Sequence, residues 1–214
     1  EKILLQAMNH SIGIDLQLPP GPVHLNFPFD EPLLSDNVQK IKCPQFSFKS
    51  SRIIDTNPTN IPVLSKAAKP LIVVGPMEEN SHQEDIIIFS EKIEAPIMAD
   101  PLSQIRYGYK NENILVNYDH FLQFVDVQPD LIIRFGKKPT SKILCQNLDK
   151  WERQTFLVDY WGKFNDDCPN FIQAPIDLFC QFQINAIDWK GELEWIKLLY
   201  SFEKEIEILI QSET

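Results

Sequence analysis

Glycine is scarce in this chain, which has seven glycines and 16 prolines among its 214 residues. Phosphate-binding loops are built from clustered glycines, because the backbone must come close to the pyrophosphate. The sequence has neither such a cluster nor a P-loop lysine pattern. The shortage argues against a dinucleotide site, and therefore against a nicotinamide- or flavin-dependent oxidoreductase.

Cysteine is also sparse, and its spacing argues against several kinds of site. The four cysteines are Cys43, Cys145, Cys168 and Cys180; none forms a C-x-x-C pair, and the four histidines are scattered. A structural zinc site needs closely spaced ligands, so we do not expect one. No cysteine has a histidine neighbour and no serine is flanked by glycines, so the sequence shows no nucleophile motif.

Basic charge and long apolar runs are lacking as well. The 30 acidic and 20 basic side chains give a formal net charge of -10, which repels a phosphate backbone and argues against a nucleic-acid partner. No run approaches the ~20 apolar residues of a membrane span, and no basic segment followed by an apolar block opens the chain. We therefore expect a cytoplasmic protein without a membrane span.

The first part of the chain suggests a piece of something larger. The first residue is Glu1 rather than methionine, and Lys2–Met8 already has a helical pattern, so we expect a longer protein. Residues 23–27 alternate between apolar and polar side chains, which is typical of a strand, and Pro28 ends the pattern.

Residues 33–68 keep neither a helical nor a strand period and contain several prolines. A stretch of that length without regular structure is unusual inside one compact domain. We interpret it as a connector with one short strand near Phe46–Phe48. The predicted organisation is then a first segment over 1–32, the connector, and a domain over 69–214.

From residue 69 onward, apolar runs alternate with helical patterns. Continuous apolar runs are typical of strands buried on both faces, and strands that alternate with helices favour a parallel sheet. We therefore predict an α/β fold, a doubly wound and mainly parallel sheet with helices on both faces, similar to a Rossmann domain. The predicted strands are Pro70–Gly75, Pro96–Asp100, Leu131–Gly136, Thr155–Asp159 and Asn170–Ala174; the predicted helices cover 81–95 (capping box Ser81 and Glu84), 119–124, 140–151, 177–184 and 190–210.

Folds of this type bind ligands at the carboxyl ends of the strands. The loops expected there are 76–81, 100–110, 137–141 and 160–168. Four aspartates lie in these loops or directly beside them, and they could chelate Mg²⁺ but are more simply solvated in so acidic a chain. These aspartates are Asp100, Asp159, Asp166 and Asp167.

The loop Gly136–Lys142 differs from the others because it is basic. Its three lysines, two hydroxyls and the free N–H groups of a helix start predict an anion site suited to a carboxylate. The alternative is that Thr140 only caps the helix and that the lysines are solvated. Arg106, from the preceding loop, could reach the same rim.

Three segments carry a resemblance to a known family. Residues 21–33 read GPVHLNFPFDEPL, residues 99–103 read ADPLS, and IRFG at 133–136 is followed by PTSK at 139–142. Together they resemble the 2-succinyl-5-enolpyruvyl-6-hydroxy-3-cyclohexene-1-carboxylate synthases, thiamine-diphosphate enzymes of menaquinone biosynthesis. The likeness covers essentially the whole chain.

The resemblance implies an enzyme of three domains, of which this chain holds the tail of the pyrimidine-binding domain (1–32), a connector (33–68) and the central domain (69–214). The complete enzyme would use thiamine diphosphate and Mg²⁺ to decarboxylate 2-oxoglutarate and add the succinyl unit to isochorismate, as a homo-oligomer. The cofactor-binding motif and the activating glutamate belong to the other two domains. We therefore expect this part to hold no cofactor or metal and to be inactive alone.

The resemblance also points to one residue. Some members place a Lys-Arg pair beside the substrate, and Lys142 matches the lysine, whereas Ile143 departs from the arginine. We therefore predict that Lys142 binds substrate, with Arg106, Lys137 and Ser141 on the rim. The alternative function is a stand-alone α/β module, a regulatory or binding protein for a small carboxylate.

Overall fold

The computed structural model describes residues 7–8, 11, 21–26, 61–77, 82–109, 111–160 and 168–212. The chain forms two compact units, Glu1–Asp55 and Thr56–Thr214. None of the described helices is long and apolar enough to cross a membrane.

The first unit does not show the strand predicted over residues 23–27. Residues 21–26 have no regular secondary structure and are mostly exposed, and Phe27 lies outside the described residues. An alternating pattern forms a strand only where a partner supplies the ladder, and no described segment pairs with this one. The prediction is therefore wrong for 23–26, whereas the strand predicted near Phe46–Phe48 falls outside the described part.

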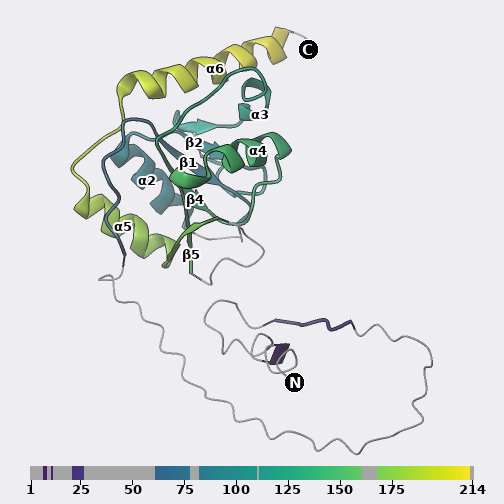
Figure 1. The fold of residues 1–214 in the computed structure, drawn as a ribbon. Helices are drawn as coiled ribbons and strands as arrows, with labels where there is room; N and C mark the ends of the chain where they lie inside the picture. The colour runs from purple at the N-terminus through teal and green to yellow at the C-terminus, as the bar shows by residue number, and fades with distance from the viewer. Residues whose placement is uncertain are drawn as a thin grey trace, which may run out of the picture. The chain divides into compact units, whose positions relative to one another are not determined.

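A six-stranded, entirely parallel sheet forms the centre of the second unit (Figure 1). Its order is β3-β2-β1-β4-β5-β6, the doubly wound arrangement, so the predicted fold class is confirmed. All five predicted strands are present, and β3, only two residues long, was too short to leave a pattern. The strands are β1 (Pro70–Val74), β2 (Ile97–Ala99), β3 (Ile114–Leu115), β4 (Leu131–Phe135), β5 (Thr155–Asp159) and β6 (Asn170–Gln173).

The predicted helices are also present, with small shifts at their ends. They are α2 (Gln83–Ile93), α3 (Tyr118–Phe121), α4 (Lys142–Lys150), α5 (Ile176–Ala186) and α6 (Leu193–Ser212), with a 3-10 turn η2 (Glu152–Gln154). The capping box predicted for α2 is wrong. The helix is preceded by His82, in the left-handed region at φ 49° and without a side-chain cap, and Ser81 lies outside the described residues.

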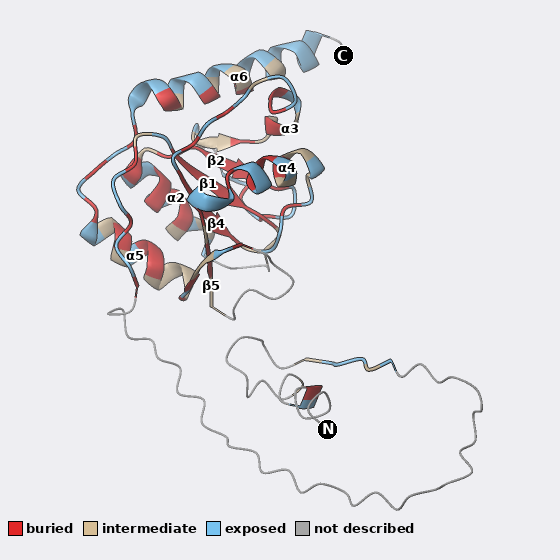
Figure 2. Ribbon diagram, viewed as in Figure 1, coloured by how far each residue is buried: buried red, intermediate tan, exposed pale blue. Residues whose placement is uncertain are grey.

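Both faces of the sheet are covered, as unbroken apolar strands require (Figure 2). Because side chains alternate along a strand, Ile72 and Val74 of β1 pack with α2 and α5, whereas Leu71 and Val73 pack with α3, α4 and α6. Each fully buried aliphatic side chain of this kind stabilises the fold by about 1.5–3 kcal/mol.

Polar contacts tie helix α6 to the sheet and to the turn between β3 and α3. The Trp195 indole donates to the Pro70 carbonyl at 2.8 Å, and the buried Glu203 carboxylate accepts the backbone N–H groups of Val116 and Asn117. Burial raises the pKa of Glu203, and these hydrogen bonds partly oppose that rise. The carboxylate thus fixes the start of α3, which contributes to the site described below.

A glycine follows both β1 and β4, because the backbones approach each other too closely at these carboxyl ends for a side chain to fit. The Gly75 N–H donates to Phe135 O at 2.9 Å, and the Lys137 N–H donates to Pro76 O at 3.0 Å. A Cβ atom on Gly75 would lie 1.8 Å from the Lys137 carbonyl oxygen. Gly136 has φ +75°, the left-handed region that glycine adopts readily.

This close approach predicts that Gly75→Ala strongly destabilises the chain. The methyl group would collide with backbone rather than with a movable side chain, so we expect a loss of at least about 3 kcal/mol in the free energy of unfolding. Urea unfolding followed by circular dichroism measures it. Gly108→Ala is the control, because φ is +91° there with no atom within 4 Å, and only backbone strain of about 1 kcal/mol should result. Equal effects for the two variants would contradict the prediction.

Candidate functional site

Asp100 is the central residue at the carboxyl edge of the sheet. It follows β2 and is fully buried. Its Oδ1 accepts the Leu102 N–H at 2.9 Å, and its Oδ2 accepts both the N–H and the hydroxyl of Thr140 at 2.7 Å each. Asp100 therefore joins the loop after β2 to the turn before α4.

These hydrogen bonds bear on the Mg²⁺ site considered from the sequence. Both Asp100 oxygens are engaged by protein donors, and the described residues contain no group of three side chains able to hold a metal ion. Asp159 ends β5, while Asp166 and Asp167 lie outside the described part. The structure thus offers an architectural role for Asp100 that needs no metal.

Helix α4 begins with a cap that the sequence left open between Thr140 and Ser141. Ser141 is the N-cap: its Oγ accepts the Leu144 N–H at 2.9 Å and donates to Asp119 Oδ1 on α3. Thr140 is instead bound to Asp100, so Ser141, the second of the two predicted residues, caps the helix and Lys142 is its first residue. The reason is a contact between distant segments, because Asp100 takes the Thr140 hydroxyl that would otherwise cap the helix.

Lys142 is the first residue of α4, at the carboxyl edge, and its side chain is exposed. Within the part of the chain that the structure describes, its ammonium group makes no hydrogen bond or ion pair. A cation in the first helical turn is disfavoured by the helix dipole, at a cost of about 0.3–1 kcal/mol. Asp100 and Asp119, which bind the two preceding residues, offset part of that cost.

The predicted rim residues lie on the loop after β2 and on the turn that joins β4 to α4. Arg106 is half-buried on the loop that begins at Asp100, and Lys137 is exposed directly after Gly136. No contact joins Arg106, Lys137 and Lys142 to one another among the described residues. All three residues thus lie on segments at the carboxyl edge of the sheet. That they bind a common ligand stays a prediction.

Two protonated groups lie beneath this edge. Tyr118 is buried, and burial, followed by the charges of Asp119 and Asp100, raises the pKa of its hydroxyl well above the usual range. The Cys145 thiol donates to the Pro139 carbonyl at 3.2 Å, and burial raises its pKa too. A thiol with a raised pKa is a poor nucleophile, because the thiolate is the reactive form.

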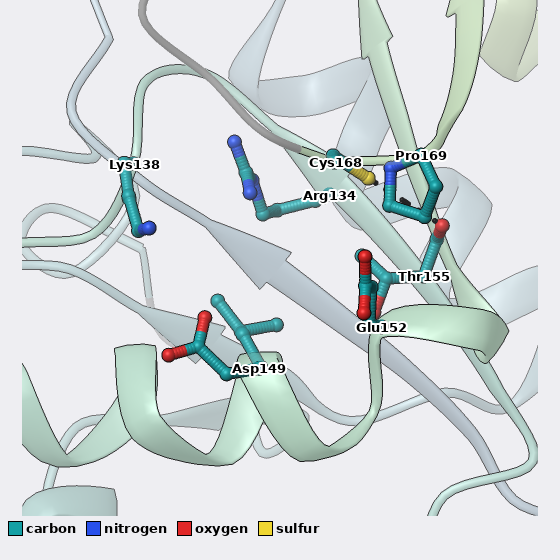
Figure 3. Close-up of a pocket in the computed structure, with 8 residues that line it drawn as sticks. Arg134, Lys138, Asp149, Glu152, Thr155, Cys168 and Pro169 are labelled. Carbon is teal, nitrogen blue, oxygen red and sulfur yellow. Dashed lines mark hydrogen bonds between the residues drawn. The ribbon is translucent and has the colours of Figure 1, made fainter.

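A hollow of about 200 Å³ lies on the α4 face of the sheet (Figure 3). Figure 3 shows the Arg134 side chain reaching into it from β4, with Lys138 to one side and Asp149 of α4 below. Two cations and two carboxylates line it, so their formal charges balance. Lys138 is one of the three lysines of the predicted basic loop, whereas sequence reasoning missed Arg134, whose signal was a charge inside an apolar strand. The lining residues are Arg134, Lys138, Leu148, Asp149, Glu152, Thr155, Cys168 and Pro169.

Comparison with curated proteins confirms the resemblance found in the sequence, although no family model matches the chain. The chain is 33% identical to the 2-succinyl-5-enolpyruvyl-6-hydroxy-3-cyclohexene-1-carboxylate synthase of Bacillus cytotoxicus, over 84% of this chain and 34% of that protein. Proteins of the same name are 36% identical in Haloquadratum walsbyi (73% and 29%) and 30% identical in Listeria monocytogenes (100% and 40%). The chain thus spans about a third of the length of the curated relatives it matches.

Among solved structures, one similar chain is an enzyme from Mycobacterium smegmatis described as thiamin diphosphate-dependent. It is 16% identical, with a TM-score of 0.40, over 58% of this chain and 26% of that chain. A similarity of this size carries no argument about function.

The cap of α4 provides a test of the framework of the site. Ser141→Ala removes the acceptor for the Leu144 N–H and the donor to Asp119, so we expect a loss of about 1–2 kcal/mol in the free energy of unfolding. Ser141→Thr keeps the hydroxyl and should lose much less. The measurement is urea unfolding of both variants beside the parent chain. If alanine and threonine are equally tolerated, Ser141 is not the effective cap.

Proposed function

We propose that this chain is the central part of a thiamine-diphosphate-dependent synthase, similar in sequence to the relatives above. Residues 1–32 would be the tail of a pyrimidine-binding domain, 33–68 a connector and 69–214 the central domain. The observation that supports this best is the similarity itself, which extends along most of the chain but only about a third of each relative. The doubly wound sheet agrees with a domain of this kind.

The proposed complete enzyme decarboxylates 2-oxoglutarate and adds the succinyl unit to isochorismate. It would do so in the cytoplasm as a homo-oligomer, with thiamine diphosphate and Mg²⁺ held by the other two domains. The described residues do not fit the cofactor or its metal. A single glycine follows β1, and Asp100 is engaged by Leu102 and Thr140. We therefore assign this part the roles of scaffold, domain interface and substrate rim.

Lys142 is the residue that we assign to the substrate rim. Its support is geometric, because the residue is exposed at the helix start and its ammonium group has no ion pair among the described residues. Helix N-termini favour anions, and a lysine adds a full positive charge beside the partial charge of the helix. Both proposed substrates carry carboxylates. Arg106, Lys137 and Ser141 would contribute to the same rim.

The first prediction from this proposal is that the purified chain has no activity alone. The chemistry of the reaction belongs to the cofactor, and without a cofactor site the protein has nothing to position. The assay follows decarboxylation of 2-oxoglutarate with added thiamine diphosphate and Mg²⁺, and the full-length protein serves as the positive control. Turnover that persists through repurification of the chain would overturn its assignment as a non-catalytic part.

The second prediction concerns Lys142→Ala in the full-length enzyme. Losing a charge-assisted contact should raise the KM for a carboxylate substrate about tenfold, while the stability should change by less than about 0.5 kcal/mol. Lys150→Ala is a matched control, because Lys150 is an exposed lysine at the other end of α4. It should leave both quantities unchanged.

The opposite pattern would assign Lys142 a structural role. An early thermal transition together with unchanged kinetics would show that the helix, rather than the substrate, depends on this side chain. A KM that rises equally in Lys142→Ala and Lys150→Ala would indicate a general effect of charge and not a contact.

A further inference from the structure

The Asp100 carboxylate holds two loops at the candidate site, with one oxygen for each loop. Oδ1 accepts the Leu102 N–H, and the Asp100 carbonyl accepts the Ser103 N–H at 2.9 Å, so the segment that leads to Arg106 folds around this residue. Oδ2 accepts both donors of Thr140, two residues before Lys142. One buried side chain thus binds both segments that carry the predicted substrate cations.

Among side chains of this size, only a carboxylate has two oxygens that both accept hydrogen bonds. Asparagine would offer one oxygen, and its NH₂ group would face a donor in whichever loop the oxygen did not bind. Asp100 is fully buried and the hydrogen bonds that it accepts are part-buried, so losing one of them should be costly. The two-loop arrangement therefore depends on aspartate at this position.

We propose that Asp100 is a positioning residue for the carboxylate substrate, and this inference rests on the proposed role of Lys142. Asp100 does not touch the substrate, because protein donors fill both of its oxygens. It acts through Thr140, which determines where α4 begins, and through the loop after β2, which determines where Arg106 begins. Asp100 therefore helps to set the separation between the two segments that carry these cations.

The position of the helix start matters because two attractive features move with it. The partial positive charge of the α4 N-terminus and the Lys142 ammonium group are both carried by the turn that Thr140 anchors. Small displacements of binding groups are known to reduce the efficiency of an enzyme by large factors. The contact from Ser141 to Asp119 holds the same turn from α3, but it has no link to the Arg106 loop.

The test uses the full-length enzyme and the KM for its carboxylate substrate. Thr140→Val removes the hydroxyl donor to Asp100 with little change of shape and leaves the backbone N–H in place. We expect it to raise the KM about three- to tenfold with a smaller change in kcat, and Thr140→Ser should restore the parent value. Asp100→Asn, whose single amide oxygen can accept from only one of the two loops, should have the larger effect.

A control variant and a double variant distinguish substrate positioning by Asp100 and Thr140 from a merely structural role of their contact. Ser90→Ala removes another buried hydrogen bond, from Ser90 to Ala95 O at 2.6 Å, ahead of β2 rather than after it. It should lower the thermal stability without changing the KM. Thr140→Val combined with Lys142→Ala should raise the KM no further than Lys142→Ala alone, because residues that act through one another are not additive.

The outcomes distinguish this inference from the proposal on which it rests. If Lys142→Ala raises the KM but Thr140→Val does not, or if the two effects multiply independently, the positioning role of Asp100 is overturned while Lys142 stands. If Lys142→Ala leaves an active enzyme with an unchanged KM, the substrate role of Lys142 fails, and the role of Asp100 fails with it. If Asp100→Asn does not fold, the KM values of Thr140→Val and Thr140→Ser decide whether Asp100 has the positioning role.

Discussion

The parallel pairing of β1 with β4 determines where the loops of the candidate site lie. The pair runs in register from Pro70 opposite Leu131 to Val74 opposite Phe135, and all ten residues are buried. Their backbones then continue side by side, with hydrogen bonds through Gly75 and Lys137. Met77 donates to Leu102 O at 3.1 Å, which ties the loop after β2 to the same place. The contact of Asp100 with Thr140 is possible only because this pairing delivers both segments to one edge.

The electrostatics of this edge differ from those of the whole chain. A net charge of -10 repels anions at long range, yet salt screens such a field beyond about 10 Å. At short range, Asp100 and Asp119 are occupied with the donors of Thr140 and Ser141. The exposed charge at the start of α4 is Lys142, which is the contact that we propose for an anion.

Much of the architecture could be predicted because it depends on local pattern. Apolar runs predicted β1, β2, β4 and β5, since a strand that is covered on both faces carries apolar side chains on both. The pattern failed at Ile114–Leu115, where two residues are too few to show a period. It also failed at residues 23–26, where the alternation of side chains has no described strand to pair with.

The candidate site was less predictable because its contacts join distant parts of the chain. Nothing near Thr140 in the sequence shows that Asp100, 40 residues earlier, takes its hydroxyl and leaves the cap to Ser141. Asp119 carried no local signal either, since it is one acidic residue among many. The basic loop could be predicted because a glycine, a proline and two hydroxyl residues describe a helix start by themselves, but only the resemblance singled out Lys142 from its three lysines.

The order of the strands also has a consequence for how the second unit folds. Strands β1, β2 and β3 follow one another along the chain, as do β4, β5 and β6, so each half can form from contacts that are close in sequence. The central pair joins residues about sixty positions apart, and closing so long a loop carries the larger entropic cost. We infer that the two halves can gain structure early and that the β1–β4 ladder closes late. On that route, the loops of the candidate site come together only after the last strands have met.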